Sequence, residues 1–264
     1  MSAPLVSISP AALVRELESR LHADRGTALA FDADGTLWSG DVGDDVFRFA
    51  VERGRLREPA RAELERQAQS RGFACFADVN ATAKQLFDAY LAGRYPEPEI
   101  CELMTWCFAG YSLAEMVDLA AEALAFAQHA ARLNEELRPI LDFARSNAVR
   151  TIVISASPRT TVEVASRAWG FAAQDIAAST PRVVSGVIAP AMASALPYGA
   201  GKCVAGRALL GSSHWLGAFG DNAFDLEMLL EAEFGIAVRP KPALRALLGK
   251  FPGVRLLEEN FQQS

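Results

Sequence analysis

The stretch TALAFDADGT, residues 27–36, decides how this sequence folds. Its first half, residues 27–31, is short and almost wholly apolar, which is typical of a strand buried on both faces of a parallel sheet. Asp32 and Asp34 follow at the point where such a strand turns into a loop. Two carboxylates in that place need a chemical explanation, so we take them as the first candidates for a functional site.

Three similar apolar runs lie far downstream, at residues 151–154, 215–219 and 234–238. Helical patterns alternate with them, at residues 135–147, 159–169, 202–210 and 225–230. This alternation predicts an α/β fold with a doubly wound parallel sheet. Ligands bind beyond the carboxyl ends of the strands in such sheets, so we expect the site where these four strands end.

Between residues 41 and 133 the strand signals vanish and helical patterns replace them. Ser112 and Glu115 form one capping-box signal for a helix start. The pattern predicts an inserted all-helical cap domain at 41–133 and an α/β core made of 1–40 and 134–264. The insert is rich in aromatic residues, and we expect most of them to fill its own core rather than to line a substrate site.

Two further signals lie at the predicted sheet edge. Ser155, Ala156 and Ser157 end the 151–154 strand just before a helix, where hydroxyl and backbone N–H groups either bind phosphate oxygens or only cap the helix. Lys202 begins a helix, which opposes the helix macrodipole unless an anion shares the site. Each signal on its own has a plain structural explanation, and their coincidence at one edge favours a phosphate site.

The run GDN at 220–222, followed by Asp225, makes a second acidic strand end. Mg²⁺ prefers oxygen ligands and often takes only one or two carboxylates, which Asp32 and Asp221 can supply. Asp32 could then attack phosphorus while Asp34 holds a proton for the departing oxygen. Their closeness supports this division, because like charges a few ångströms apart disfavour simultaneous ionisation.

Together these motifs resemble those of the haloacid dehalogenase superfamily of phosphatases, and the resemblance covers essentially the whole chain. It rests on DADGT at 32–36, the strand-terminal Ser155, Lys202, and GDNxxD at 220–225. The resemblance implies that Asp32 is the nucleophile and that Asp34 is the general acid and later the base. It further implies that phosphate is bound by Ser155, Ala156, Ser157 and Lys202. The metal ligands that it implies are Asp32, the backbone carbonyl of Asp34, and Asp221. Asp225 would orient the metal site, and Thr36 would support the loop that carries Asp34.

The position of the insert resembles the helical-cap branch that includes phosphoserine phosphatase. Asp41 stands where those enzymes have a glutamate that contacts the substrate amino group, and Gly35 stands where they usually have a serine. A phosphorylcholine or phosphoethanolamine phosphatase is the alternative. In that case Trp38 and Asp41 would contact a cationic head group, whereas Trp38 would otherwise pack beneath the cap.

We therefore expect a Mg²⁺-dependent phosphatase that hydrolyses a small phosphomonoester through a phospho-aspartate. A phosphotransferase would use the same residues and differ only in the acceptor. A dehalogenase needs neither an acid at position 34 nor a metal, and a non-catalytic scaffold would be expected to lack a catalytic residue, so both are less well supported.

Composition limits the partners of this chain. It has 264 residues, a formal net charge of -6 and no basic stripe, which argues against nucleic acid and anionic membranes as partners. The beginning of the sequence lacks the apolar region of a signal peptide, and no run of about 18 apolar residues follows, so we expect a cytoplasmic protein. The expected partner is a small phosphorylated metabolite, and the expected assembly is a monomer or homodimer.

Overall fold

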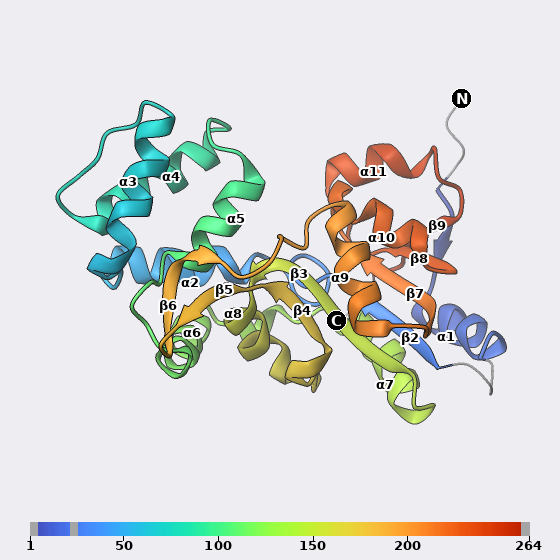
Figure 1. Cartoon of the computed structure of the whole chain (residues 1–264). Helices are drawn as coiled ribbons and strands as arrows, with labels where there is room; N and C mark the ends of the chain where they lie inside the picture. The colour runs from blue at the N-terminus through green and yellow to red at the C-terminus, as the bar shows by residue number, and fades with distance from the viewer. Residues whose placement is uncertain (1–4, 22–25, 260–264) are drawn as a thin grey trace.

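A computed structural model of the chain describes residues 5–21 and 26–259. Its main feature is a parallel sheet of seven strands in the order β1-β9-β8-β7-β2-β3-β4 (Figure 1). The strands are β1 (Ser7–Ile8), β2 (Thr27–Phe31), β3 (Arg150–Pro158), β4 (Ile176–Ser179), β7 (His214–Gly220), β8 (Phe234–Ala237) and β9 (Val254–Leu257). The predicted parallel α/β sheet is confirmed.

Helices cover both faces of this sheet. Leu29 and Phe31 of β2 belong to a buried cluster with α1 (Pro10–Ser19) and α7 (Arg138–Ser146). The alternate residues Ala28 and Ala30 belong to a second cluster, with α9 (Ala200–Leu210), α10 (Leu226–Glu231) and α11 (Pro242–Leu248). Because side chains alternate between the two faces of a strand, burial of both faces explains why β2 is apolar throughout.

The sequence predicted the central strands and missed the short outer ones. The predicted runs correspond to β2, β3, β7 and β8, and the predicted 159–169 helix corresponds to α8 (Arg159–Ala165) with the 3-10 turn η4 (Ser166–Trp169). The missed strands β1, β4 and β9 have 2, 4 and 4 residues. The recognised β8 also has four residues, but it is apolar throughout, whereas β1, β4 and β9 each include a polar residue and are too short to show an alternation.

The insert is helical, as expected. Within residues 41–133, all of which are described, the regular elements are α2 (Val42–Glu52), η1 (Glu58–Ala60), α3 (Arg61–Ser70), α4 (Val79–Leu91), α5 (Glu97–Trp106), α6 (Leu113–Phe126) and η2 (His129–Arg132). The capping box of Ser112 and Glu115 is present at the start of α6. The division into two domains at 41 and 133 stays a prediction, and residues 1–4, 22–25 and 260–264 of the predicted core lie outside the described residues.

A β-hairpin from the second half of the chain lies against these helices (Figure 1). It consists of β5 (Pro181–Val184) and β6 (Val187–Met192), which pair antiparallel. The backbone of Ile188 exchanges hydrogen bonds of 2.8 Å with Gly110 and Tyr111, just before α6. The helical layer is therefore completed by residues that the sequence assigned to the core.

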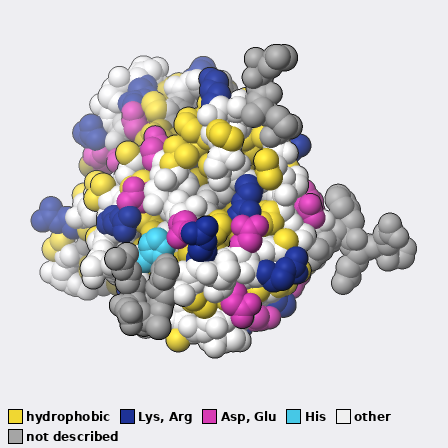
Figure 2. Space-filling model, turned by 90° about the vertical axis from the view of Figure 1, so that its right-hand side faces the viewer, with side chains coloured by type: hydrophobic (Ala, Val, Ile, Leu, Met, Phe, Trp, Pro, Cys, Tyr) yellow, Lys and Arg dark blue, Asp and Glu magenta, His cyan; other side chains and the backbone are white. Residues whose placement is uncertain are grey.

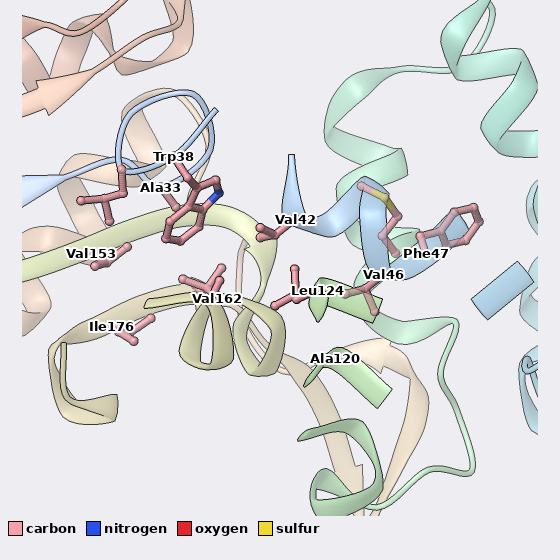
Figure 3. Close-up of a cluster of buried hydrophobic side chains, with 14 of the residues drawn as sticks. Ala33, Trp38, Val42, Val46, Phe47, Ala120, Leu124, Val153, Val162 and Ile176 are labelled. Atoms are coloured by element: carbon pink, nitrogen blue, oxygen red, sulfur yellow. The ribbon is translucent and has the colours of Figure 1, made fainter. Parts of the chain in front are cut away.

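The insert and the sheet share one continuous hydrophobic core (Figure 3). Val46 of α2 and Leu124 of α6 lie in the same buried cluster as Val162 of α8 and Val153 of β3. This packing fixes the start of α2 next to the carboxyl ends of β2 and β3. The segment that follows Asp34 is thereby held over the sheet edge where the site was expected.

On the molecular face shown in Figure 2, positive and negative side chains are interspersed. Ion pairs also link elements that are distant in sequence, including Arg255 of β9 with Glu16 of α1 at 2.8 Å. No helix in the described part of the chain combines the length and the apolar character needed to cross a bilayer.

Candidate active site

The carboxyl ends of three neighbouring strands bring the predicted residues to one edge of the sheet. Asp32 follows β2, Asp221 follows β7, and Ser155 lies in β3 on the other side of β2. The backbone N–H of Asp32 donates to Phe219 O at 2.8 Å, which fastens the end of β2 to β7. The sheet order thus places groups from opposite ends of the sequence together.

Three carboxylates and one lysine form the centre of this site. One oxygen each of Asp32, Asp221 and Asp225 lies within 4.8 Å of the others, and all three residues are buried. Lys202 has no exposed surface and forms ion pairs with Asp32 and Asp225. Buried charges persist only when they are paired and hydrogen-bonded, so Lys202 stabilises two of these carboxylates, Asp32 and Asp225.

The electrostatics of the cluster favour a bound cation. Burial, and then the charge of Asp225, raise the pKa of Asp32 well above its usual value, although Lys202 opposes them. Burial likewise raises the pKa of Asp221 to about 6. Further positive charge would therefore stabilise the ionised form of both carboxyls.

The residues present fit a Mg²⁺ ion. Asp221 Oδ1 is buried and has no hydrogen-bond partner among the described residues, while Oδ2 of the same side chain pairs with Lys241 at 3.0 Å. A buried oxygen without a partner is costly, and carboxylate oxygens are preferred Mg²⁺ ligands. Asp225 uses its oxygens otherwise, accepting from Lys202 and from the backbone N–H groups of Asp221 and Asn222, so it holds the loop in place.

Gly35 has no alternative at its position. Its φ is +83°, a left-handed conformation, and a Cβ atom there would collide with the carboxylate of Asp221. The close approach of these two segments explains why a glycine follows the paired aspartates in this chain.

Asp34 lies beside the central cluster but is held by other groups. Trp38 Nε1 and the backbone N–H of Val42 each donate to Asp34 Oδ1 at 2.8 Å. Ser157 Oγ donates to Asp34 Oδ2 at 2.6 Å. This carboxylate thus joins the loop after β2, the start of α2 and the end of β3.

Trp38 does not have the exposed ring that a cationic head group would need. It is fully buried, and its ring meets that of His129 edge-on with centroids 4.9 Å apart. Both its N–H and its ring are used inside the protein. The head-group interpretation of Trp38 is therefore wrong, and the packing interpretation is confirmed.

The remaining predicted residues form hydrogen bonds that the sequence alone did not predict. Thr36 Oγ1 donates to Asp32 Oδ2 at 3.3 Å, so this hydroxyl contacts Asp32 rather than the side chain of Asp34. Ser155 Oγ accepts from the backbone N–H of Ser157 at 3.0 Å, and Ala156 lies between them. Asp41 caps α2 by accepting from Asp44 N at 2.9 Å, and burial, followed by Asp34, raises its pKa well above the usual value.

Sequence reasoning missed Lys241 and Asn134. Lys241 binds Asp221 twice, through Nζ to Oδ2 at 3.0 Å and through its backbone N–H to the carbonyl oxygen at 2.8 Å. It precedes the Pro242 that begins α11, so the argument that singled out Lys202, a cation at a helix start, would have found it. Asn134 donates to the carbonyls of Gly35 and Thr36 at 3.3 and 2.7 Å, a role for which the sequence holds no local signal.

A family model described as haloacid dehalogenase-like hydrolase matches residues 29–230, a range that includes every predicted site residue. The chain belongs to this family. No match to this hydrolase was found among curated proteins.

Solved structures agree with this hydrolase in fold. A protein of unknown function from Bordetella pertussis Tohama I superposes with a TM-score of 0.69 at 20% identity, covering 89% of this chain and 98% of that one. A HAD family hydrolase from Salmonella enterica serovar Typhi gives 0.57 at 17% identity, covering 89% and 68%. A phosphoserine phosphatase in its apo form gives 0.52 at 14% identity, covering 89% and 94%. At these identities the likeness concerns the fold.

Proposed function

We propose that this hydrolase is a Mg²⁺-dependent, phosphoserine phosphatase-like enzyme that hydrolyses a small phosphomonoester through a phospho-aspartate on Asp32. One observation carries the proposal. Asp32 ends a buried strand within 4.8 Å of Asp221 and Asp225, beside a buried lysine and an unpartnered carboxylate oxygen. This arrangement combines a nucleophile, positive charge and a vacant oxygen ligand in one place.

In this proposal Asp32 and Asp221 hold the metal ion, together with the backbone carbonyl of Asp34. When bound, Mg²⁺ supplies charge that stabilises the phosphoryl oxygens and orients them. Lys202 and Thr36 keep the Asp32 carboxylate in place through contacts to its two oxygens. A nucleophile with both oxygens positioned loses little freedom when it attacks, which lowers the barrier.

Asp34 is the acid and base of the proposed reaction. Asp32 attacks phosphorus, the bond to the leaving oxygen breaks, and Asp34 delivers a proton to that oxygen. Water then attacks the phospho-aspartate while Asp34 takes its proton, which restores Asp32 and releases phosphate. Hydrogen bonds donated by Trp38, Val42 and Ser157 fix the position of the Asp34 carboxyl before substrate binds.

The proposal is tested with a panel of phosphomonoesters: phosphoserine, phosphorylcholine, phosphoethanolamine, sugar phosphates and nucleotides. We expect release of free phosphate in Mg²⁺ buffer, its loss with a chelator and its return when Mg²⁺ is restored. Transfer of the phosphoryl group to an added alcohol, without free phosphate, would identify a phosphotransferase. Absence of both products from the whole panel would contradict the proposal.

Binding of Mg²⁺ is expected to weaken with acidity. A carboxyl must lose its proton to bind a metal, and the pKa of Asp221 lies at about 6. The ionised fraction of such a group falls about tenfold between pH 7 and pH 5, and the raised pKa of Asp32 acts in the same direction, so the Mg²⁺ affinity is expected to fall about tenfold or more. Isothermal titration calorimetry with Mg²⁺ at the two pH values measures it. Equal affinities at pH 5 and pH 7 would contradict metal binding by a carboxyl with this raised pKa.

A cationic leaving group, as in phosphorylcholine or phosphoethanolamine, has one observation in its favour. Asp41 and Asp44 lie together at the start of α2. Burial and then the charge of Asp34 raise the pKa of Asp44 to about 6. An ammonium group bound there would relieve the repulsion among these carboxylates, so such esters are the second candidate in the panel.

A further inference from the structure

Lys241 differs from Lys202 in having ammonium N–H donors that are still accessible to a ligand. Lys202 is wholly buried and is shared between Asp32 and Asp225. The Lys241 side chain is 51% exposed, and within residues 5–21 and 26–259 its one ion pair joins Nζ to Asp221 Oδ2 at 3.0 Å. A lysine ammonium carries three N–H donors, so Lys241 has donors left for a ligand that arrives from solvent.

The backbone holds Lys241 firmly at this place. After β8, Val238 N donates to Gly220 O at 2.9 Å and Lys241 N donates to Asp221 O at 2.8 Å. Between them, Arg239 has a positive φ of 42° and forms an ion pair with the buried Glu136. A left-handed conformation in a residue other than glycine persists only where its surroundings hold it, and here the contacts on both sides do so.

The surroundings of Lys241 keep it charged. Burial lowers its pKa, but Asp221, Asp32 and Asp41 outweigh that effect and raise it above the usual value. The lysine thus contacts the Asp221 carboxylate and also feels the negative charge of Asp32 and of Asp41 at the start of α2. A substrate phosphate approaching Asp32 enters this strongly negative neighbourhood.

A dianionic phosphate needs more positive charge than Lys202 can provide. Lys202 is already bound by two of the three central carboxylates, Asp32 and Asp225. We propose that Lys241 is a second phosphate-binding cation of this site, which donates an N–H to a non-bridging oxygen of the phosphoryl group while it keeps Asp221 in place. This inference rests on the proposed phosphatase function and adds a residue outside the 29–230 range of the family model.

The test measures inorganic phosphate binding to the full chain in Mg²⁺ buffer by isothermal titration calorimetry. Lys241→Met is expected to weaken binding about tenfold or more, because a hydrogen bond to a charged group is lost. Lys241→Arg keeps the charge and is expected to stay within about threefold of the wild type. Lys250→Met, at an exposed lysine beyond the end of α11, is the matched control and is expected to change nothing.

Mg²⁺ affinity is measured separately for each variant. If Lys241→Met loses as much affinity for Mg²⁺ as for phosphate, the lysine acts only through Asp221 and the proposal is wrong. It is also wrong if this variant weakens binding of esters but not of inorganic phosphate, because the lysine then contacts the leaving group. Lys241→Gln gives the same comparison should methionine disturb folding.

The outcomes separate this proposal from the function on which it rests. If the wild type and Lys241→Met bind phosphate with equal affinity, Lys241 is not a phosphate-binding residue, and the phosphatase proposal stands. If the wild type binds no phosphate in Mg²⁺ buffer, both the role of Lys241 and the phosphatase proposal are contradicted.

Discussion

Replacement of Asp32 by asparagine is expected to reduce phosphate release in Mg²⁺ buffer by about 10⁴-fold or more, the scale seen when a nucleophile is lost. The amide of Asp32→Asn has nearly the shape of the carboxylate but cannot form the phospho-aspartate. Thr36 and Lys202 still surround the side chain, so the fold is expected to survive. Initial rates with the best ester of the panel, together with far-ultraviolet circular dichroism, measure both expectations.

The matched control is Asp118→Asn, which removes an exposed carboxylate on α6 far from the sheet edge. This variant is expected to keep the full rate. Turnover by Asp32→Asn at the level of this control would mean that another group attacks phosphorus, and the mechanism would have to be rebuilt.

Replacement of Lys202 by methionine is expected to lower the free energy of unfolding by about 3–5 kcal/mol, as measured by urea unfolding at pH 8. The reason is the burial of its two partners. Asp32 and Asp225 are 3% and 0% exposed, so without the ammonium group they remain as charges that water cannot solvate. Methionine has a similar volume, so the loss reports charge rather than a cavity.

The cost of Lys202→Met should shrink in acid. Lys202 lowers the pKa of Asp32, so its removal raises that pKa further above the unfolded value near 4. A carboxyl that binds its proton more tightly in the folded state adds stability as pH falls. The deficit is therefore expected to be full above the folded pKa of Asp32 and smaller at pH 5 than at pH 8.

Lys84→Met provides the contrast, because Lys84 pairs with Asp88 on the exposed face of α4. Loss of a surface pair is expected to cost about 0–1 kcal/mol. If Lys84→Met and Lys202→Met destabilise the protein equally, the buried cluster is not held together by its charge balance.

The sequence predicted the central fold because burial on both faces leaves a strong signal. The run 27–31 is apolar throughout since alternate residues face two separate clusters. The sequence did not predict which segment the hairpin β5–β6 would contact. Its hydrogen bonds with Gly110 and Tyr111 join segments that are distant in sequence, and local patterns do not report such contacts. Local patterns predict which elements form, and they predict less well what those elements touch.

The candidate site shows the same division. Asp32, Asp221, Asp225 and Lys202 were each recognisable as unusual at the end of a strand or the start of a helix, and the structure brings them together. The contacts of Trp38 were not predictable, because whether an aromatic ring faces solvent or lies beneath a helix depends on packing of the whole molecule. Lys241 was predictable by the argument used for Lys202.

The common core in Figure 3 limits how substrate can reach Asp32. A rigid swing of the whole insert would pull Val46 and Leu124 away from Val162 and wet all three. Exposing one such side chain completely costs about 1.5–3 kcal/mol, so a hinge of that kind would work against several apolar contacts in every catalytic cycle. An opening motion that leaves α2 and α6 seated against α8 would keep these three side chains buried and avoid that cost.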